Sequence, residues 1–337
     1  MKRISNFYAT GTLSAIFILS GLSQPAAAQC PSTWDASNYE IASQDWSGQN
    51  SVPLNFTSLY YTPTGAKIAL GNGSEFASSG DTNYLLNAAD HYVYKVTEGM
   101  LPGTQTPGIL ASAVTPWAGY TQIQVLNGQL YAWVNTRLGA PFANGLTFDA
   151  GSSILGVTFD GQYLWVASSG YLWRLNPATA TTAPSLAGKY SLASAAGPLT
   201  YDGRYIWMLS TNSSGNSLVK IDPSIGQQIA SVAAAASGSP VFDGVYFWFA
   251  AGSNGLAKMD PVSTNITQIP ASAALSSSLG FDGVAVWAGN GSGAVQVRTC
   301  DGRSLAAISL AGVPAQVVYN GKHYWATYQN SNMVTFF

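Results

Sequence analysis

One short pattern recurs through the second half of this chain and constrains its fold more than any other feature. An aromatic residue followed by Asp-Gly or Asn-Gly begins at Phe159, Tyr201, Phe242, Phe281 and Tyr319, with steps of 42, 41, 39 and 38 residues. A tryptophan follows each of these glycines by four residues, at Trp165, Trp207, Trp248, Trp287 and Trp325. A repeat of about 40 residues indicates similar structural units that pack on their neighbours.

Each unit contains the signals of four short antiparallel strands. Asp-Gly and Asn-Gly favour a tight hairpin turn, because both residues tolerate positive φ. In the unit that begins at Tyr201, the strand after the turn has Tyr205 and Trp207 on one face, because side chains two residues apart point the same way. A third strand near Leu218 to Ile221 ends at Asp222-Pro223, and a fourth follows near Ile229 to Val232. This spacing is typical of propeller blades.

Two looser copies precede the clear ones. Asn127-Gly128 with Trp133 forms one, and the segment from Asn83 to Val96, with Tyr84 near the tryptophan position, forms the other. The count predicts an all-β fold, a seven-bladed β-propeller of four-stranded antiparallel blades. Six or eight blades stay open, because the second copy is compressed to 32 residues between Trp133 and Trp165.

The last unit has signals for only three strands before Phe337. Its missing outer strand predicts a ring closed by an N-terminal strand, from around Leu54 to Tyr61 or Lys67 to Leu70. Such a strand would also cover an exposed sheet edge.

The first 28 residues are interpreted as a secretory signal peptide. Lys2 and Arg3 precede an apolar run from Ala15 to Leu22 and the small residues at 26–28. The run is too short for a membrane span, and no other segment comes close. We therefore expect a signal peptide at 1–28, an N-terminal extension at 29–50 and a propeller at 51–337, in a protein exported to the periplasm or outside the cell.

Charged residues make up only 8% of the chain, and the formal net charge is −2. A chain so poor in Lys and Arg lacks the electrostatic footprint for nucleic acid. Two cysteines, Cys30 and Cys300, are predicted to form a disulfide in an oxidising compartment, with two separate thiols as the alternative.

Most conspicuous side chains are explained by the repeat. The repeat tryptophans are interpreted as buried wedges between blades and the repeat aspartates as turn residues. No nucleophile elbow or phosphate loop is present, and the two histidines leave a zinc site short of ligands, so neither a catalytic residue, a metal nor a cofactor is predicted. An alternative site would require Asp90, His91 and His323 to converge, since a seven-bladed ring makes the first and last blades neighbours.

The loops predict an uncharged polar surface on one side of the disc. Loops between the second and third strands, which share a side with the inter-blade connections, contain Asn135, Asn212, Asn254, Asn290 and Asn330. Ordinary turn chemistry also favours asparagine there. Trp117 and Trp173 break the repeat register and are the aromatic candidates for ligand binding.

The unit aromatic-Asp-Gly, then Tyr-x-Trp, then Val219-Lys220-Ile221-Asp222-Pro223 resembles the bacterial propeller repeats of the YVTN and streptogramin-lyase-like superfamily. The resemblance is clearest from Val157 to Phe337. It implies the propeller fold. Streptogramin lyases use His and Glu residues around a metal, but no Glu follows Glu98 here and the late blades offer only His323, so that chemistry does not carry over.

These observations predict an exported, non-enzymatic binding module for a neutral polar ligand such as a glycan, or for a protein partner. Two alternatives stay open. One is a lyase or hydrolase with a site at the central channel. The other is a self-associating subunit of an extracellular assembly, in which low charge would help chains to pack.

Overall fold

The computed structural model describes residues 54–61, 66–79, 82–101, 103–104, 107–140, 147–179, 181–213, 215–251, 255–269, 275–291, 293–299, 302 and 304–337. The predicted signal peptide and N-terminal extension lie outside these residues, and so do Cys30 and Cys300. The disulfide therefore stays a prediction. In the described part of the chain, no helix is long and apolar enough to cross a membrane.

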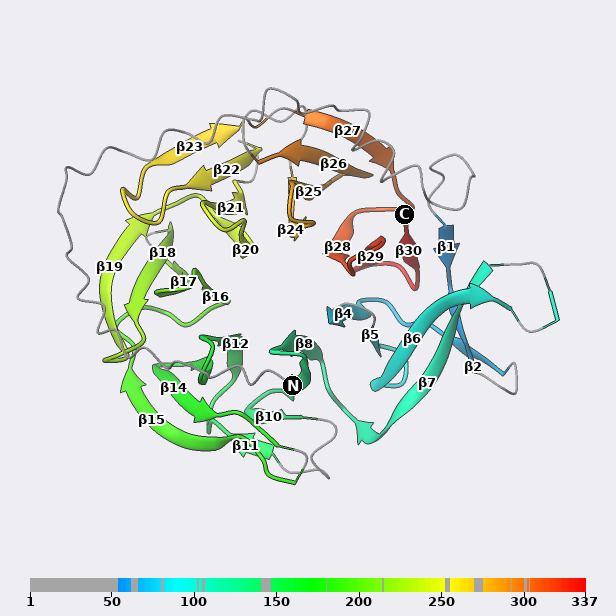
Figure 1. Cartoon of the computed structure of the whole chain (residues 1–337), viewed down its shortest axis with the longest axis horizontal. Coiled ribbons are helices and arrows are strands. Elements are labelled where there is room, and N and C mark those ends of the chain that lie inside the picture. Colours follow the sequence, from blue (N-terminus) through cyan, green and yellow to red (C-terminus); the bar gives the residue numbers. More distant parts are fainter. Residues whose placement is uncertain are drawn as a thin grey trace, which may run out of the picture.

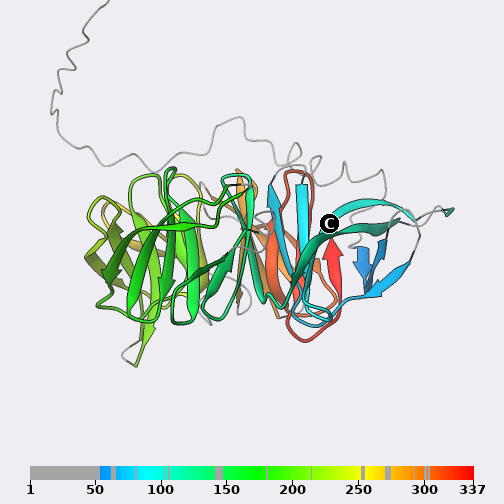
Figure 2. The same cartoon turned by 90° about the horizontal axis from the view of Figure 1, so that it is seen from below.

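The protein is a ring of seven antiparallel sheets, which confirms the predicted propeller (Figure 1). Each blade begins with its innermost strand and proceeds outward, so β4, β8, β12, β16, β20, β24 and β28 surround the axis. Edge-on, the ring is a disc from which one sheet projects (Figure 2).

Blades 2 to 6 each contain four strands consecutive in sequence. Blade 2 contains β8 (Gln122–Leu126), β9 (Gln129–Val134), β10 (Arg137–Gly139) and β11 (Thr147–Asp149). Blade 3 contains β12 (Ile154–Phe159), β13 (Leu164–Ser168), β14 (Tyr171–Asn176) and β15 (Ser185–Ser191). Blade 4 contains β16 (Leu199–Tyr201), β17 (Ile206–Asn212), β18 (Gly215–Asp222) and β19 (Gln227–Ala233). Blade 5 contains β20 (Ser237–Phe242), β21 (Phe247–Ala250), β22 (Leu256–Met259) and β23 (Ile266–Ile269). Blade 6 contains β24 (Leu275–Phe281), β25 (Ala285–Asn290), β26 (Gly293–Arg298) and β27 (Ser304–Ser309).

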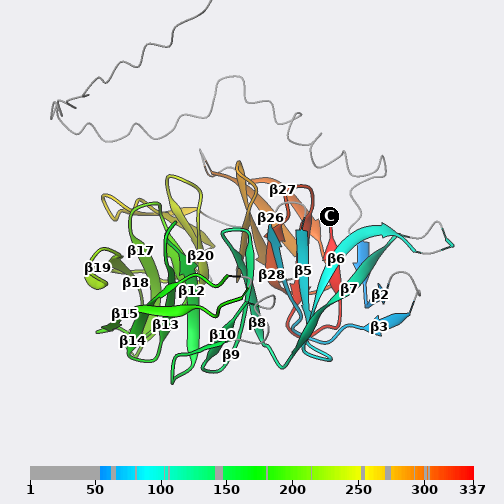
Figure 3. The same cartoon turned by 60° about the horizontal axis from the view of Figure 1, so that its bottom comes forward.

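Blade 1 is the sheet that projects. Its own strands are β4 (Glu75–Ser79), β5 (Thr82–Asn87), β6 (Tyr92–Met100) and β7 (Pro107–Ala118). Two further strands, β2 (Ser58–Tyr61) and β3 (Lys67–Ala69), extend it to six, with β2 parallel to β7. These added strands lie outside the ring (Figure 3). The repeat did not predict them, because they come from outside its period.

Blade 7 confirms the predicted ring closure. Its strands β28 (Pro314–Tyr319), β29 (Tyr324–Tyr328) and β30 (Val334–Phe336) are completed by the N-terminal β1 (Leu54–Phe56). The Tyr328 hydroxyl lies 2.7 Å from Thr335 Oγ1, which donates to Asn55 Oδ1 at 2.5 Å. The Phe56 and Phe336 rings stack at 5.0 Å. A short strand is thus fixed by polar and aromatic contacts as well as by its backbone.

The repeat tryptophans are buried, as predicted, and four of them are fully buried: Trp165, Trp207, Trp248 and Trp325. Each wedge fills the space toward the next blade; the Trp207 ring in blade 4, for example, lies 5.3 Å from that of Phe247 in blade 5. Burial of an indole would cost a hydrogen bond if its N–H had no acceptor.

The repeat aspartates supply that acceptor in the three central blades. Oδ1 of Asp202 accepts the backbone N–H groups of Arg204 and Tyr205, which fixes the turn. Oδ2 of the same carboxylate accepts the indole N–H of Trp207 at 2.7 Å. Blades 3 and 5 repeat this bond through Asp160 and Asp243. One carboxylate thus joins the turn to the inter-blade core.

Candidate functional site

The two sides of the disc differ in charge. The side that we call the aspartate face carries the turns between first and second strands and between third and fourth strands. Its described carboxylates are Asp160, Asp202, Asp243, Asp282, Asp222 and Asp260. Oδ1 of each carboxylate already accepts at least one turn N–H group, as Asp222 does from Ser224.

The opposite side, which we call the neutral face, carries the turns between second and third strands and the connections between blades. In the described turns and connections on this side, the ionisable side chains are Asp90 and His91. The adjoining strand ends add Lys189 and the exposed pair Arg137 and Asp149. Small residues dominate the rest, for example 150–153 and 192–198. An uncharged polar surface was predicted here, and most of the described turns and connections have that composition, but these charged strand ends in blades 2 and 3 interrupt it.

The structure places the predicted asparagines unevenly. Asn135 is an exposed turn residue with φ of 48°, and Asn330 is exposed in the turn between β29 and β30. Asn290 is half-buried at the end of β25. Asn212 ends β17, but its side chain is not among the described ones, and Asn254 lies outside the described residues. Of the five, Asn135 and Asn330 are therefore the ones that the structure describes as exposed.

Trp173 lies in β14 with only 8% of its surface exposed. Its indole N–H donates to Ser168 Oγ at 2.8 Å, and its ring meets that of Phe148 in blade 2 edge-on at 5.4 Å. It therefore belongs to the packing between blades 2 and 3. The exposed aromatic residue beside it is Tyr171, whose ring centroid lies 5.8 Å away. Trp117 lies in β7, and its side chain is outside the described ones.

The alternative trio does not assemble. Asp90 and His91 form the turn between β5 and β6 on the neutral face, whereas His323 lies between β28 and β29 on the aspartate face. Asp90 accepts the Tyr94 hydroxyl at 2.7 Å and the backbone N–H of Tyr92. Blade 7 does neighbour blade 1, as predicted, but the meander puts these residues at opposite ends of their strands.

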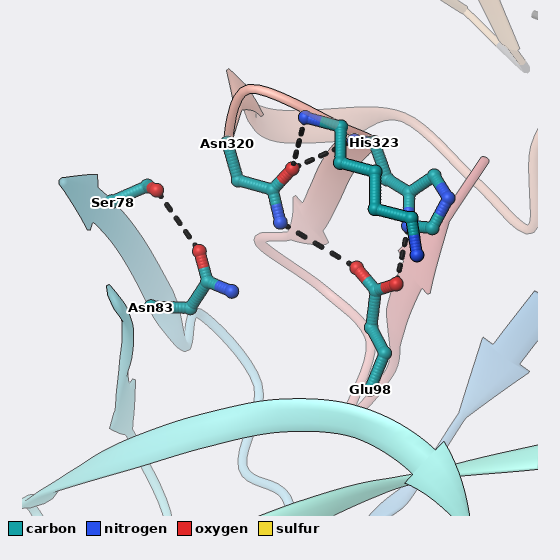
Figure 4. A network of polar contacts seen from close by, with 6 residues as sticks. Ser78, Asn83, Glu98, Asn320 and His323 are labelled. Carbon is teal, nitrogen blue, oxygen red and sulfur yellow. Dashed lines mark hydrogen bonds and ion pairs between the residues drawn. The ribbon is translucent and has the colours of Figure 1, made fainter. Parts of the chain in front are cut away.

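His323 instead forms a pair that the sequence did not reveal. Its Nδ1 contacts Oε2 of Glu98, which projects from β6 of blade 1 toward the blade 7 turn (Figure 4). The Asn320 amide lies near the other Glu98 oxygen, with Nδ2 to Oε1 at 3.5 Å. The His323 ring also stacks on Phe336 at 5.8 Å. Since both side chains are largely buried, this cluster joins the first and last blades rather than offering an open site.

A second buried carboxylate lies at the opposite, neutral end of blade 1. Oε2 of Glu75, the first residue of β4, accepts the Ile123 N–H of β8 at 3.0 Å. Burial raises the pKa of Glu75 to about 7, and the hydrogen bond from Ile123 opposes part of that rise. Glu75 therefore titrates near neutrality while it bridges the inner strands of blades 1 and 2.

The described residues contain no group of three or more His, Cys, Asp or Glu side chains that could hold a metal ion. The separate pairs Glu98–His323 and Asp90–His91 lie on different faces.

Comparison with known proteins supports the fold of this chain but not a particular family or function. No protein-family model matches the chain, and no curated protein matches it. Among solved structures, the chain is similar to hydrazine synthase of Kuenenia stuttgartiensis (TM-score 0.58, 14% identity, 82% of this chain and 98% of that one). It is also similar to apo AztD of Citrobacter koseri (TM-score 0.53, 12% identity, 75% and 90%). The WD40 domain of Neurospora crassa Pan2 gives a TM-score of 0.59 at 7% identity, with 78% and 87% covered. At these identities the likeness is one of architecture: the chain has the β-propeller fold.

Proposed function

We propose that this protein is an exported, non-enzymatic binding module that presents its neutral face to an uncharged polar ligand. The observation that carries the proposal is the difference in charge between the two faces. A ligand rich in hydroxyl or amide groups needs hydrogen-bonding partners and no countercharge, and the neutral face offers hydroxyls, amides and turn backbone. Charged ligands would find more partners on the aspartate face.

The propeller suits this role because it holds many turns rigidly on one side of a disc. Binding residues commonly lie on loops that a stiff scaffold positions. The neighbours with this fold include a hydrazine synthase and a WD40 domain, so fold alone does not select among functions. The resemblance to the YVTN and streptogramin-lyase-like repeats, and the export implied by the signal-like N-terminus, form part of the proposal.

A protein partner is the second candidate. WD40 domains, which share this architecture, are often protein-interaction modules, and the projecting six-stranded sheet of blade 1 adds surface outside the ring. The neutral face remains the first choice as the binding surface, because its composition indicates which ligand chemistry it would suit. The projecting sheet of blade 1 gives no such indication.

An array of neutral and acidic glycans, probed with the labelled protein, tests the proposal. Two variants obstruct the neutral face with a long cation at exposed positions, Ser153→Arg between blades 2 and 3 and Asn330→Arg in blade 7. Val262→Arg places the same side chain on the aspartate face, at a residue that is 84% exposed. We expect neutral glycans to be retained, and binding to be lost in at least one neutral-face variant but kept in Val262→Arg. Retention of acidic glycans alone, or loss only in Val262→Arg, would contradict the proposal.

A further inference from the structure

One position of the blade distinguishes three neighbouring blades from the other four. It is the first residue of the third strand, directly after the turn on the neutral face. In blades 1, 2 and 3 this residue is Tyr92, Arg137 and Tyr171. In blades 4 and 6 it is Gly215 and Gly293, and in blades 5 and 7 it is the fully buried Leu256 and Val334.

All three of these side chains are planar and exposed. Tyr92 is 38% exposed and Tyr171 is 39% exposed. The Arg137 side chain is 68% exposed, and its Nε lies 4.0 Å from Oδ2 of Asp149, which is itself 55% exposed. Because an ion pair this exposed is weak, the guanidinium stays available for other hydrogen bonds, while Oδ1 of Asp149 also accepts the Gly151 N–H at 2.8 Å.

The supporting contacts hold the Tyr171 ring in place and fix the backbone at Tyr92. The Lys189 ammonium lies 3.7 Å from the Tyr171 ring centroid and 4.3 Å from that of Trp173, so that Tyr171 is backed by a buried aromatic and a cation. Tyr92 follows Asp90, whose carboxylate accepts the Tyr92 N–H at 3.0 Å. A side chain already held in place loses little conformational freedom when a ligand binds.

The blades that carry these residues are adjacent. The inner strands β4, β8 and β12 follow one another around the axis (Figure 1), and β8 contacts both of the others. Tyr92, Arg137 and Tyr171 therefore form an arc over one sector of the neutral face, with the charged pair between two aromatic rings.

We infer that this arc binds a neutral oligosaccharide, with Tyr92 and Tyr171 stacking on sugar rings and the Arg137–Asp149 pair bonding hydroxyl groups. A pyranose ring has an apolar C–H face that suits an aromatic surface and hydroxyl edges that suit a guanidinium or carboxylate. An arc over three blades fits a chain of several sugars better than a single one. The inference rests on the proposed function and names its ligand class and its sector.

Calorimetric titration with linear hexasaccharides and disaccharides of glucose, xylose and mannose tests the inference. We expect at least one hexasaccharide to bind at least tenfold more tightly than its disaccharide. Tyr92→Ala, Arg137→Ala and Tyr171→Ala should each weaken it about tenfold, or 1.4 kcal/mol. Tyr171→Phe keeps the ring and should retain most of the affinity. Gln329→Ala, at an exposed residue of the β29–β30 turn on the neutral face outside the arc, and Arg204→Ala, on the aspartate face, are the matched controls. Asn330→Ala tests whether the rest of the neutral face contributes.

The outcomes separate the two proposals. If Asn330→Ala weakens binding and the three arc variants do not, the arc is wrong and the neutral face stands. If the glycan array yields a neutral ligand but no hexasaccharide of the panel binds, the ligand class inferred for the arc is wrong. If no neutral ligand binds in either experiment, both proposals fail. Thermal unfolding of every variant shows whether a loss reflects unfolding, and a Tyr171→Ala protein that has unfolded leaves Tyr92→Ala and Arg137→Ala to decide.

Discussion

The indole N–H of Trp207 donates to Asp202 Oδ2 at 2.7 Å, while the other oxygen of the same carboxylate holds the preceding turn. One side chain therefore links a surface turn to the buried wedge between two blades. The same geometry recurs in blades 3 and 5, whereas the indole N–H groups of Trp133, Trp287 and Trp325 have no such acceptor among the described residues.

Asp202→Asn should destabilise the protein by about 1–3 kcal/mol. The amide oxygen can still accept the turn N–H groups, but its NH₂ then faces the Trp207 N–H, so that two donors oppose one another in the core. Urea unfolding followed by tryptophan fluorescence measures the change. The control is Asp222→Asn, at an exposed turn whose carboxylate contacts Ser224 and no tryptophan, and it should shift stability by less than about 0.5 kcal/mol. Equal losses in both variants would mean that the indole bond contributes nothing.

Asn320 occupies the aspartate position of blade 7, and the Trp325 indole N–H has no hydrogen-bond partner among the described residues. Asn320→Asp would provide an acceptor for the indole but would also place a second carboxylate beside Glu98. We expect a net loss of stability of about 1–2 kcal/mol at pH 7. In the Glu98→Gln background the same change should be neutral or stabilising, because the repulsion is gone.

A double-mutant cycle built from the four proteins gives the coupling between positions 98 and 320. A coupling near zero would show that Glu98 is not what disfavours aspartate in blade 7. Hydrogen exchange of the turn before β29 would then locate the affected region.

Glu75 makes stability depend on pH near neutrality. Its pKa is raised from 4.5 to about 7 in the folded protein, so the folded state binds a proton that the unfolded state has released. Its contribution is therefore complete below about pH 4.5 and is lost as the pH rises through 7, with an upper limit of about 3 kcal/mol. We expect the melting temperature to fall as the pH rises from about 5 to about 7.5, and Glu75→Gln to remove most of that fall. An unchanged slope in the variant would assign the effect to other groups.

Phe56→Ala should loosen the ring closure. Loss of the aromatic stack with Phe336 removes buried contact area from a strand of three residues and should cost about 2–4 kcal/mol. Hydrogen–deuterium exchange should rise in β30 and β29 before it rises in blades 3 to 5. Leu186→Ala, at a residue that is 56% exposed on β15, is the control and should leave exchange unchanged. Uniform exchange across all blades would indicate that the ring unfolds as one unit.

Sequence reasoning predicted what the repeat encodes. The turn aspartates, the buried tryptophans and the blade number all follow from a pattern that five units share. Ring closure was predictable too, because a three-stranded last unit needs a fourth strand from elsewhere. The sequence offered two segments for that role, and the structure uses 54–56 for closure and 67–69 as the outermost strand of blade 1.

The remaining features depend on contacts between units. Glu98 and His323 meet only because blade 1 lies beside blade 7, and neither belongs to the repeated pattern. Blade 1 has no tryptophan or aspartate at the usual places. Its buried Asn87, at the end of β5, fixes the segment before β4, because it accepts the Gly71 N–H and donates to Ala69 O. The sequence did not reveal the arc of Tyr92, Arg137 and Tyr171, because these residues share no motif. Their equivalence becomes visible only when the blades are aligned on the first residues of their third strands.

Joining β1 to β30 imposes an order on biogenesis. Asn55 and Thr335, which bond across this junction, are 280 residues apart, so β1 leaves the ribosome long before its partner exists. Blades 2 to 6 are each made of consecutive residues and can form locally, but the circle cannot lock until the final strand has been synthesised. Until then β1 has no partner and blade 7 has an open edge.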